Sequence, residues 1–224
     1  DEIINGYGNH IKIVLHKDGA ITVADNGRGV PIGMHESGKS TPEVIYTVLH
    51  AGDKFEEGNY KVSGGLHGVG GSVVNALSKW MDVIIYRDGV ISNIRFKDGG
   101  EVDSPLKTIG TTNKTGTIVT FMRDYEIFKN SQFSYTTIVE RMQESAFLIP
   151  SVIIEVIDED GGKETKFHYE NGLIDFVDYM NEGKATLNKV LQFSGTKNGI
   201  EVDVAMQYTD TYNENIISFV NNVK

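Results

Sequence analysis

The stretch from residue 61 to residue 72 reads KVSGGLHGVGGS, and five of its twelve residues are glycine. An apolar run of small residues at 73–77 follows directly and is typical of a short helix. The first N–H groups of a helix lack partners within it, and its dipole favours negative charge there. Glycine also lets an anion approach the backbone closely. The residue types therefore predict either a phosphate-binding turn or a surface loop before a packed helix, and they leave both open.

Two familiar phosphate loops do not fit this stretch. A P-loop has a lysine directly after its last glycine, and no lysine follows Gly70. A dinucleotide-binding turn comes tightly after a buried strand, whereas residues 52–60 are mostly polar and charged. The stretch is closer to a long lid, in which Lys54 either meets phosphate or is simply solvated.

The composition bounds the class of protein. The chain has 224 residues, of which 39% are hydrophobic and 25 are glycine, as expected for a globular α/β protein. It has no cysteine, no long apolar run and no signal-peptide pattern, so we expect a cytoplasmic protein without disulfides or a membrane partner. The six histidines show no metal-ligand spacing, so no zinc site is expected. A net charge of -10 argues against a DNA-gripping surface on this chain, but not against a role in a larger DNA-handling assembly.

Hydrophobic patterns predict mainly hairpins and few crossover connections. We predict strand pairs at 11–16 with 20–25, 83–87 with 91–96, and 152–157 with 166–169, single strands at 117–121, 200–208 and 215–223, and helices starting at 41 and spanning 135–148 and 173–180. This order favours an α+β two-layer sandwich with a mixed, mostly antiparallel sheet and helices on one face. A domain boundary is expected near residue 171, and residues 1–6 resemble the end of a helix.

Polar residues stand at the ends of three predicted strands. By the two-residue period, Asp25 continues the apolar face of Ile21 and Val23. Asp25 is either a turn residue that caps Gly27 and faces solvent, which the residue types alone favour, or a buried acceptor for an exocyclic amine. Thr117 and Arg87 end their strands in the same ambiguous way.

Three short boxes, in this order, resemble the ATP-binding domain of the GHKL superfamily. They are DNGRGVP at 25–31, GLHGVG at 65–70 and TGT at 115–117. Residues 47–52, 60–78, 144–148, 167–170 and 218–222 resemble the B subunits of bacterial type II topoisomerases more narrowly, with details nearer to the topoisomerase IV branch than to the gyrase branch. The resemblance implies a GHKL (Bergerat) ATP-binding domain at 1–170 and the beginning of a transducer domain at 171–224.

The resemblance also implies roles for individual residues. Asp25 would accept the adenine amine, with a water bridging to Gly29 and Thr117, between candidate walls Ile45, Val23, Val30 and Val119. The triphosphate would lie by Lys54 and be wrapped by Gly65, Leu66, His67, Gly68, Val69, Gly70 and Gly71. Glu2 and Arg28 would pair at the mouth of the pocket, and Pro31 and Arg87 would line the outer part, where ATP-competitive inhibitors of the coumarin type bind.

The resemblance implies ATP and Mg²⁺ as cofactors, ATP-dependent dimerisation of B subunits, a topoisomerase IV A subunit as partner, and DNA held by the whole nucleoid-associated complex. In this family the general-base glutamate and the Mg²⁺-binding asparagine precede Asp1, so no catalytic or metal residue is expected in this chain. The 224-residue chain is expected to be monomeric and not to hydrolyse ATP. Asp53 replaces the usual glycine and puts the local lid conformation in doubt. The alternatives are a gyrase B subunit, a GHKL signalling or chaperone module, and a structural domain with no ligand.

Overall fold

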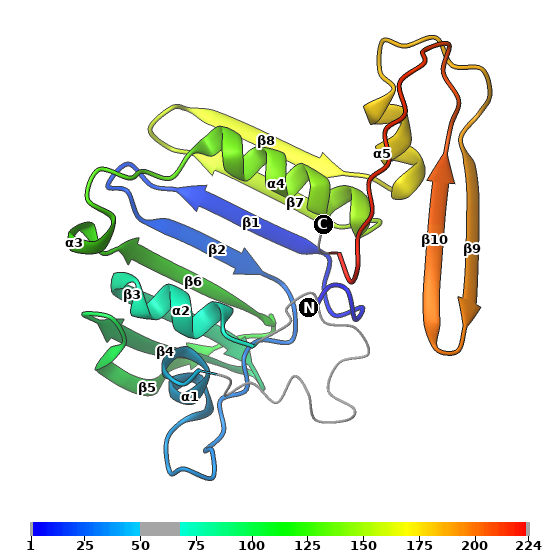
Figure 1. The fold of residues 1–224 in the computed structure, drawn as a ribbon. Coiled ribbons are helices and arrows are strands. Elements are labelled where there is room, and N and C mark those ends of the chain that lie inside the picture. The colour runs from blue at the N-terminus through cyan, green and yellow to red at the C-terminus, as the bar shows by residue number, and fades with distance from the viewer. Residues whose placement is uncertain (1, 50–67, 223–224) are drawn as a thin grey trace.

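The computed structural model describes residues 2–49 and 68–222 (Figure 1). An eight-stranded sheet runs in the order β5-β4-β3-β6-β2-β1-β7-β8, and a separate two-stranded sheet pairs β9 with β10. The strands are β1 (His10–Leu15), β2 (Ile21–Asp25), β3 (Ser78–Arg87), β4 (Val90–Lys97), β5 (Glu101–Thr111), β6 (Gly116–Arg123), β7 (Ile153–Asp158), β8 (Lys163–His168), β9 (Leu191–Lys197) and β10 (Ile200–Met206). The helices are α1 (Thr41–Thr47), α2 (Gly70–Ala76), α3 (Tyr125–Phe128), α4 (Tyr135–Leu148) and α5 (Leu173–Met180).

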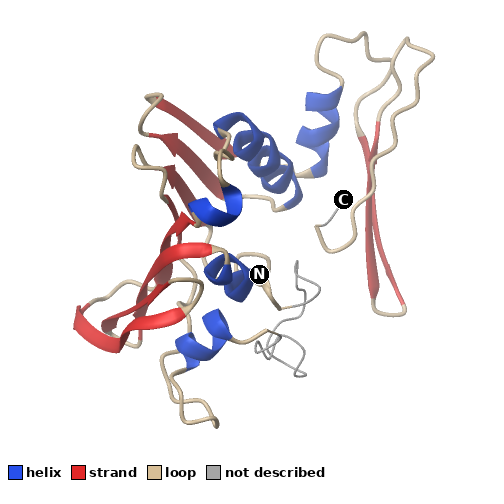
Figure 2. Cartoon of the chain, turned by 60° about the vertical axis from the view of Figure 1, so that its left-hand side comes forward, coloured by secondary structure: helices blue, strands red, loops and turns tan. Residues whose placement is uncertain are grey.

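The large sheet is mixed, with a single parallel pair among its described strands. β1 pairs with β7 in parallel, and every other neighbouring pair is antiparallel. Helices α1, α2 and α4 cover one face, as the two views show (Figures 1 and 2). The prediction of a two-layer, mostly antiparallel fold is confirmed.

Two separate hydrophobic cores join the helices to the sheet. The first lies between α4 and strands β1, β2, β7 and β8, and its buried members are Ile13, Leu15, Ile21, Ala146, Val152, Ile154, Val156 and Phe167. The second lies between α1 and strands β3 and β4, and its buried members are Tyr46, Met81, Val83, Ile85, Ile94 and Phe96. The ends of the central strands β2 and β6 therefore lie between two cores rather than inside one.

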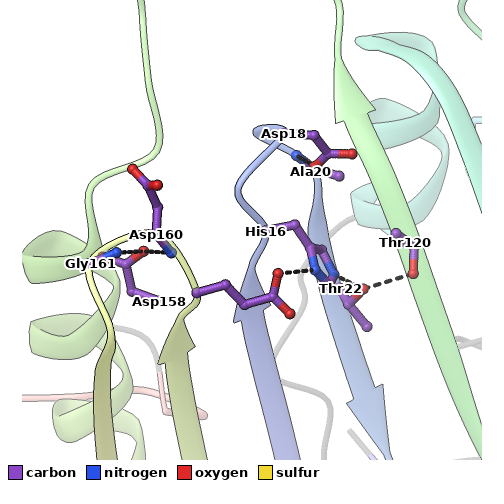
Figure 3. A network of polar contacts seen from close by, with 9 residues as sticks. His16, Asp18, Ala20, Thr22, Thr120, Asp158, Asp160 and Gly161 are labelled. Atoms are coloured by element: carbon purple, nitrogen blue, oxygen red, sulfur yellow. Dashed lines mark hydrogen bonds and ion pairs between the residues drawn. The ribbon is translucent and has the colours of Figure 1, made fainter.

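The other face of the central strands is polar. His16 contacts the Thr22 hydroxyl through Nε2 at 2.7 Å and Glu159 through Nδ1 at 3.1 Å (Figure 3). The hydroxyl of Thr22 lies 2.8 Å from that of Thr120 on the neighbouring strand. Side chains alternate across a strand, so the Asp25 face of β2 is the face toward the helices.

Several predicted boundaries hold and others are wrong. The helices at 135–148 and 173–180 match the structure residue for residue. β5 and β9 were not predicted: β5 is an edge strand that contains Pro105, a residue that argues against a strand in the sequence, and β9 is exposed along its whole length. β3 begins at Ser78 rather than at residue 83. The strand predicted at 215–223 is absent from residues 215–222, where Val220 forms an isolated β-bridge but no ladder of paired residues extends from it.

Residues 173–206 form α5 and the separate β9–β10 hairpin (Figure 1). Stacked aromatic rings join α5 to α4: the Phe147 ring lies 3.8 Å from that of Tyr169 and 4.9 Å from that of Phe176, measured between ring centres. Within residues 2–49 and 68–222, no helix is both long enough and apolar enough to cross a membrane.

One buried amide links the two short helices beside the site. Asn75 is 1% exposed, and its Nδ2 donates to the carbonyl oxygen of Tyr46 at 2.9 Å, which ties α2 to α1. We expect Asn75→Ala to lower the free energy of unfolding by about 1–2 kcal/mol, because a buried carbonyl loses its donor. Urea unfolding measures this loss. Val74→Ala on the same helix is the control: the Val74 side chain is 36% exposed, so its truncation should lower the free energy of unfolding by less. Equal losses in the two variants would show that the hydrogen bond is unimportant.

Candidate functional site

Asp25 and Thr117 lie directly opposite each other on β2 and β6. Their outer neighbours in the same cross-strand row are Ile11 on β1 and Ile85 on β3. Ile85 is fully buried, and Ile11 packs against the first core. A carboxyl and a hydroxyl are therefore set side by side in an otherwise apolar row that faces the helix layer.

The next row forms an apolar floor. Val23 lies opposite Val119, and these residues stand between Ile13 and Val83 of the two cores. Val23 is 37% exposed although it lies in the middle of the sheet. Ile45, Val30 and Val119 are partly buried at the edge of the second core. The structure thus brings the predicted wall residues to the same region as Asp25.

The Asp25 carboxyl is both hydrogen-bonded and desolvated. Its Oδ1 accepts the Gly27 N–H at 2.8 Å, as the turn interpretation expects. Burial raises the pKa of Asp25, the amides of Gly27 and Thr117 oppose this rise, and the charge of Glu2 adds to it. Asp25 is therefore a partly buried acceptor rather than a solvent-facing turn residue.

Thr117 is 6% exposed and is fixed by a neighbouring loop. Its Oγ1 accepts the N–H of Val30 at 3.1 Å. Since this bond uses the hydroxyl as an acceptor, its hydrogen remains available for donation. The pair of Asp25 and Thr117 can thus present an acceptor and a donor to one bound group.

Two glycines allow the close backbone approach around this pair. Gly29 has φ +78°, and a Cβ atom there would lie 2.6 Å from the carbonyl oxygen of Tyr86. Gly116 has φ +140°, and a Cβ atom there would lie 2.2 Å from the carbonyl oxygen of Asp25. Any side chain at either position would push the strand ends apart. Arg87 further fixes this end by donating from Nη1 to the carbonyl oxygen of Gly29.

Glu2 and Arg28 form a two-pronged ion pair beside the turn after β2. The Arg28 Nη2–Glu2 Oε1 distance is 2.8 Å and the Nε–Oε2 distance is 3.0 Å. The Arg28 N–H also donates to Glu2 Oε2 at 3.0 Å, and the guanidinium lies 3.7 Å from the centre of the Tyr7 ring. The predicted pairing is present, and Pro31 lies exposed just beyond it.

We expect Glu2→Gln to lower the free energy of unfolding by less than about 1 kcal/mol. The Arg28 and Glu2 side chains are 40% and 25% exposed, so solvent screens their attraction. Thermal unfolding at low and at high salt measures this, and the difference between wild type and variant should shrink as salt rises. A salt-independent loss of more than about 2 kcal/mol would contradict the expectation.

Tyr46 of helix α1 lies near the Asp25 carboxyl. No pattern in the sequence singled out this residue. Ser40 caps the helix, accepting the Glu43 N–H at 3.4 Å, with Pro42 in the first turn. Burial raises the pKa of the Tyr46 phenol, and the charge of Asp25 raises it further. A Cβ atom at Gly71 would lie 3.3 Å from the Tyr46 ring. Tyr46 thus supports the start of α2. In the sequence it lies within an apolar helical stretch, which predicts only an ordinary core position.

Only part of the glycine-rich stretch falls within the described residues. Gly68 has φ +60°, and Val69 precedes α2 without a side-chain cap on the first N–H groups of the helix. Gly70 and Gly71 begin α2. The remaining predicted phosphate contacts lie outside the described residues, namely Lys54, Gly65, Leu66 and His67. No three His, Asp or Glu side chains in the described parts of the chain gather into a possible metal site.

Comparison with known proteins shows the family of the chain. A protein-family model described as "Histidine kinase-, DNA gyrase B-, and HSP90-like ATPase" matches residues 1–125, more than half of the chain. The chain belongs to this ATPase family. A second family model, described as "DNA gyrase B", matches residues 172–224. Members of this ATPase family bind nucleotide, and the Asp25–Thr117 region lies within the first match.

The relatives in this ATPase family are longer than the chain. The DNA topoisomerase 4 subunits B of Staphylococcus aureus strains Mu50 / ATCC 700699 and N315 are each 57% identical over 227 residues, covering 100% of this chain and 34% of the relative. The crystal structure of the 43K ATPase domain of Thermus thermophilus gyrase B in complex with an aminocoumarin matches with a TM-score of 0.84 and 39% identity, covering 95% of this chain and 55% of that one. The chain thus spans about a third of the length of these curated relatives.

Proposed function

We propose that the Asp25–Thr117 pair binds the adenine of ATP. The proposal rests on the cross-strand row that contains Asp25 and Thr117. In this row a desolvated carboxylate acceptor and a hydroxyl donor lie side by side between two apolar cores. The exocyclic amine of adenine is a donor that suits Asp25, and a ring nitrogen is an acceptor that Thr117 can reach directly or through a water shared with Gly29. The apolar floor of Val23 and Val119 suits the flat face of the base.

The triphosphate would extend from the adenine toward the start of α2. Gly71 lies against Tyr46 of α1 there, and no side chain caps the first N–H groups of α2. The proposed phosphate contacts are those of the sequence prediction: Lys54, Gly65, Leu66, His67, Gly68, Val69, Gly70 and Gly71. Bound Mg²⁺ would neutralise phosphate charge. Glu2, Arg28, Pro31 and Arg87 would border the outer part of the pocket, where ATP-competitive inhibitors would reach.

We propose that the whole protein is the B subunit of a DNA topoisomerase IV in the cytoplasm, associated with the nucleoid. The 57% identity to two S. aureus topoisomerase 4 subunits B supports this more strongly than the 39% identity to a gyrase B domain supports gyrase. ATP binding would close two B subunits around a transported duplex, and hydrolysis would reset them, with the A subunit as partner in the complex. The net charge of -10 suits a gate that does not itself grip DNA.

Residues 171–224 would begin a transducer domain. The β9–β10 hairpin places Phe193 opposite Val204 on one face, and these side chains are 58% and 44% exposed. A two-stranded hairpin with an exposed apolar face is not stable by itself. Further segments of the longer protein would therefore complete this sheet.

DNA assays with the full-length B subunit and its A subunit test this proposal. We expect linked DNA circles to be separated only when ATP is present. Introduction of negative supercoils into relaxed DNA would instead identify a gyrase. ATP-independent activity, or ATP binding without any change in DNA topology, would contradict the proposal and favour a signalling or chaperone module.

A further inference from the structure

The side chain of Asn26 continues the β1–β2 ladder beyond its last strand pair. The ladder ends where Ile11 lies opposite Asp25. One residue further, Asn26 Oδ1 accepts the N–H groups of Asn9 and His10, each at 2.9 Å. The backbone N–H of Asn26 donates to the carbonyl oxygen of His10 at 3.3 Å. The chain that enters β1 is therefore held by a side chain rather than by a further strand residue.

These contacts fix which way the Asn26 carboxamide points. Two N–H donors meet at one of its atoms, and only the oxygen can accept both. The Nδ2 group then faces Asn9, to whose Oδ1 it donates at 3.0 Å. The carbonyl oxygen of Asn9 accepts the N–H of Ile153 at 2.8 Å, so Asn9 is held from both sides. Gly8 has φ +85°, and a Cβ atom there would lie 2.6 Å from both the backbone oxygen and Oδ1 of Asn26, which leaves no room for a side chain.

The segment held by Asn26 carries Glu2 to the turn that follows β2. It closes on itself, since the N–H of Tyr7 donates to the carbonyl oxygen of Glu2 at 2.9 Å. A Cβ atom at Gly27 would lie 2.9 Å from Cβ of Glu2, and the N–H of Gly27 is the donor that holds Asp25. The charge of Glu2 also adds to the raised pKa of Asp25. The segment is thus packed directly against the turn that positions the Asp25 carboxyl.

We propose that Asn26 is a positioning residue of the adenine site. Its carboxamide holds residues 2–9 against the turn, and this segment keeps water away from the Asp25 carboxyl. The inference rests on the proposed binding of adenine by Asp25. Asn26 is itself exposed, so it acts through the segment and not by burying surface of its own. A shielded acceptor binds a donor more strongly than a solvated one, so loosening the segment weakens nucleotide binding.

Titration calorimetry with a non-hydrolysable ATP analogue tests the proposal. We expect Asn26→Ala to bind the analogue roughly fivefold more weakly, a partial loss because the Glu2–Arg28 ion pair still holds the far end of the segment. Asn26→Asp keeps an oxygen that accepts both N–H groups, and the Asn9 carboxamide can rotate to donate to the other oxygen. Its affinity should stay within about twofold of wild type. Asn130→Ala, at an exposed asparagine after α3, is the control and should bind like wild type.

Gly8→Ala tests the same contact from the other side. The added methyl group would push the segment away from Asn26, so this variant should also bind the analogue roughly fivefold more weakly. The double variant should bind no more weakly than either single variant, because both changes break one contact. NMR titration of the Asp25 carboxyl gives a readout that needs no nucleotide. The pKa of Asp25 should fall in both single variants, because Glu2 moves away and water reaches the carboxyl.

The outcomes separate this inference from the adenine assignment. Unchanged analogue binding in Asn26→Ala, additive losses in the double variant, or an unchanged Asp25 pKa would each overturn the inference. So would a lower stability of Asn26→Ala with the same affinity, since that shows a purely structural role. Unchanged binding in Asp25→Asn would refute the adenine assignment and the inference with it. The two failures are distinguishable, because only the second leaves binding insensitive to the loss of the Asp25 carboxylate.

Discussion

Asp25→Asn is expected to weaken binding of a non-hydrolysable ATP analogue by roughly 100-fold, as measured by titration calorimetry. The amide keeps the size of the carboxyl and an oxygen that can still accept the Gly27 N–H, so the turn after β2 should persist. It replaces one acceptor by an NH₂ donor, which would meet the adenine amine donor to donor. The loss is large because a buried acceptor that is charged contributes more than a neutral one.

The same substitution should not destabilise the protein at neutral pH. Burial raises the pKa of Asp25 in the folded state above its unfolded value. Its ionised form is therefore less favourable in the folded chain, and stability falls as the pH rises from the unfolded pKa through the folded pKa. The amide introduced by Asp25→Asn cannot ionise. The free energy of unfolding of the variant should therefore not fall as the pH rises through the acidic range, and the variant should be at least as stable as wild type at neutral pH. Urea unfolding at several acidic pH values measures the difference.

Asp18→Asn is the matched control for both measurements. Asp18 lies in the turn between β1 and β2 and, like Asp25, accepts the N–H two residues ahead, at 2.9 Å, but it is exposed and lies at the other end of β2. Nucleotide affinity should be unchanged in this variant. If Asp25→Asn bound the ATP analogue as tightly as wild type and Asp18→Asn, the adenine assignment would be wrong.

Phe147→Ala is expected to lower the free energy of unfolding by about 3–5 kcal/mol. The Phe147 side chain is 1% exposed, and its ring stacks on Tyr169 and Phe176 with centres 3.8 and 4.9 Å away. The Tyr179 ring lies 5.3 Å from it, so truncation removes the centre of a group of four rings. Because the rings belong to α4, to the segment after β8 and to α5, the loss should also loosen the contact between α5 and α4.

Urea unfolding followed by circular dichroism measures the effect of Phe147→Ala. Tyr212→Ala is the control, since that aromatic side chain is fully exposed and should change stability by less than about 0.5 kcal/mol. Phe147→Leu should lose less than Phe147→Ala, because it fills part of the cavity. A loss below about 1.5 kcal/mol for Phe147→Ala would show that the surrounding rings collapse into the space.

Local patterns in the sequence predict part of this site. The two-residue period places Asp25 on the face of Ile21 and Thr117 on the face of Val119, and the structure agrees. That these two residues lie opposite each other depends on the register between strands about ninety residues apart, which no local pattern contains. The family resemblance supplied the link between them.

The residues that the sequence missed share one property: their roles come from tertiary contacts. Tyr46 occupies an ordinary helical position and matters because Asp25 and Gly71 lie beside it. Asn75 matters through the carbonyl of Tyr46. Arg123 ends an apolar strand, where an arginine is normally solvated, and becomes unusual only when α3 and the following loop bury it.

The strand order also has a consequence for how the protein folds during synthesis. Within the eight-stranded sheet, the β1–β2 hairpin is made before β6 and β7, with which its two edges pair. The paired residues are 92–100 positions apart for β2 with β6 and 143 positions apart for β1 with β7. Until those strands arrive, the hairpin exposes two unpaired edges, and a pairing so distant in sequence forms slowly. Asp25 has its partner Thr117 only after β6 has been inserted. With adenine held by the proposed Asp25–Thr117 pair, a nascent chain that stops earlier would carry only half of the site. A bound nucleotide would then stabilise only chains that have completed the central sheet.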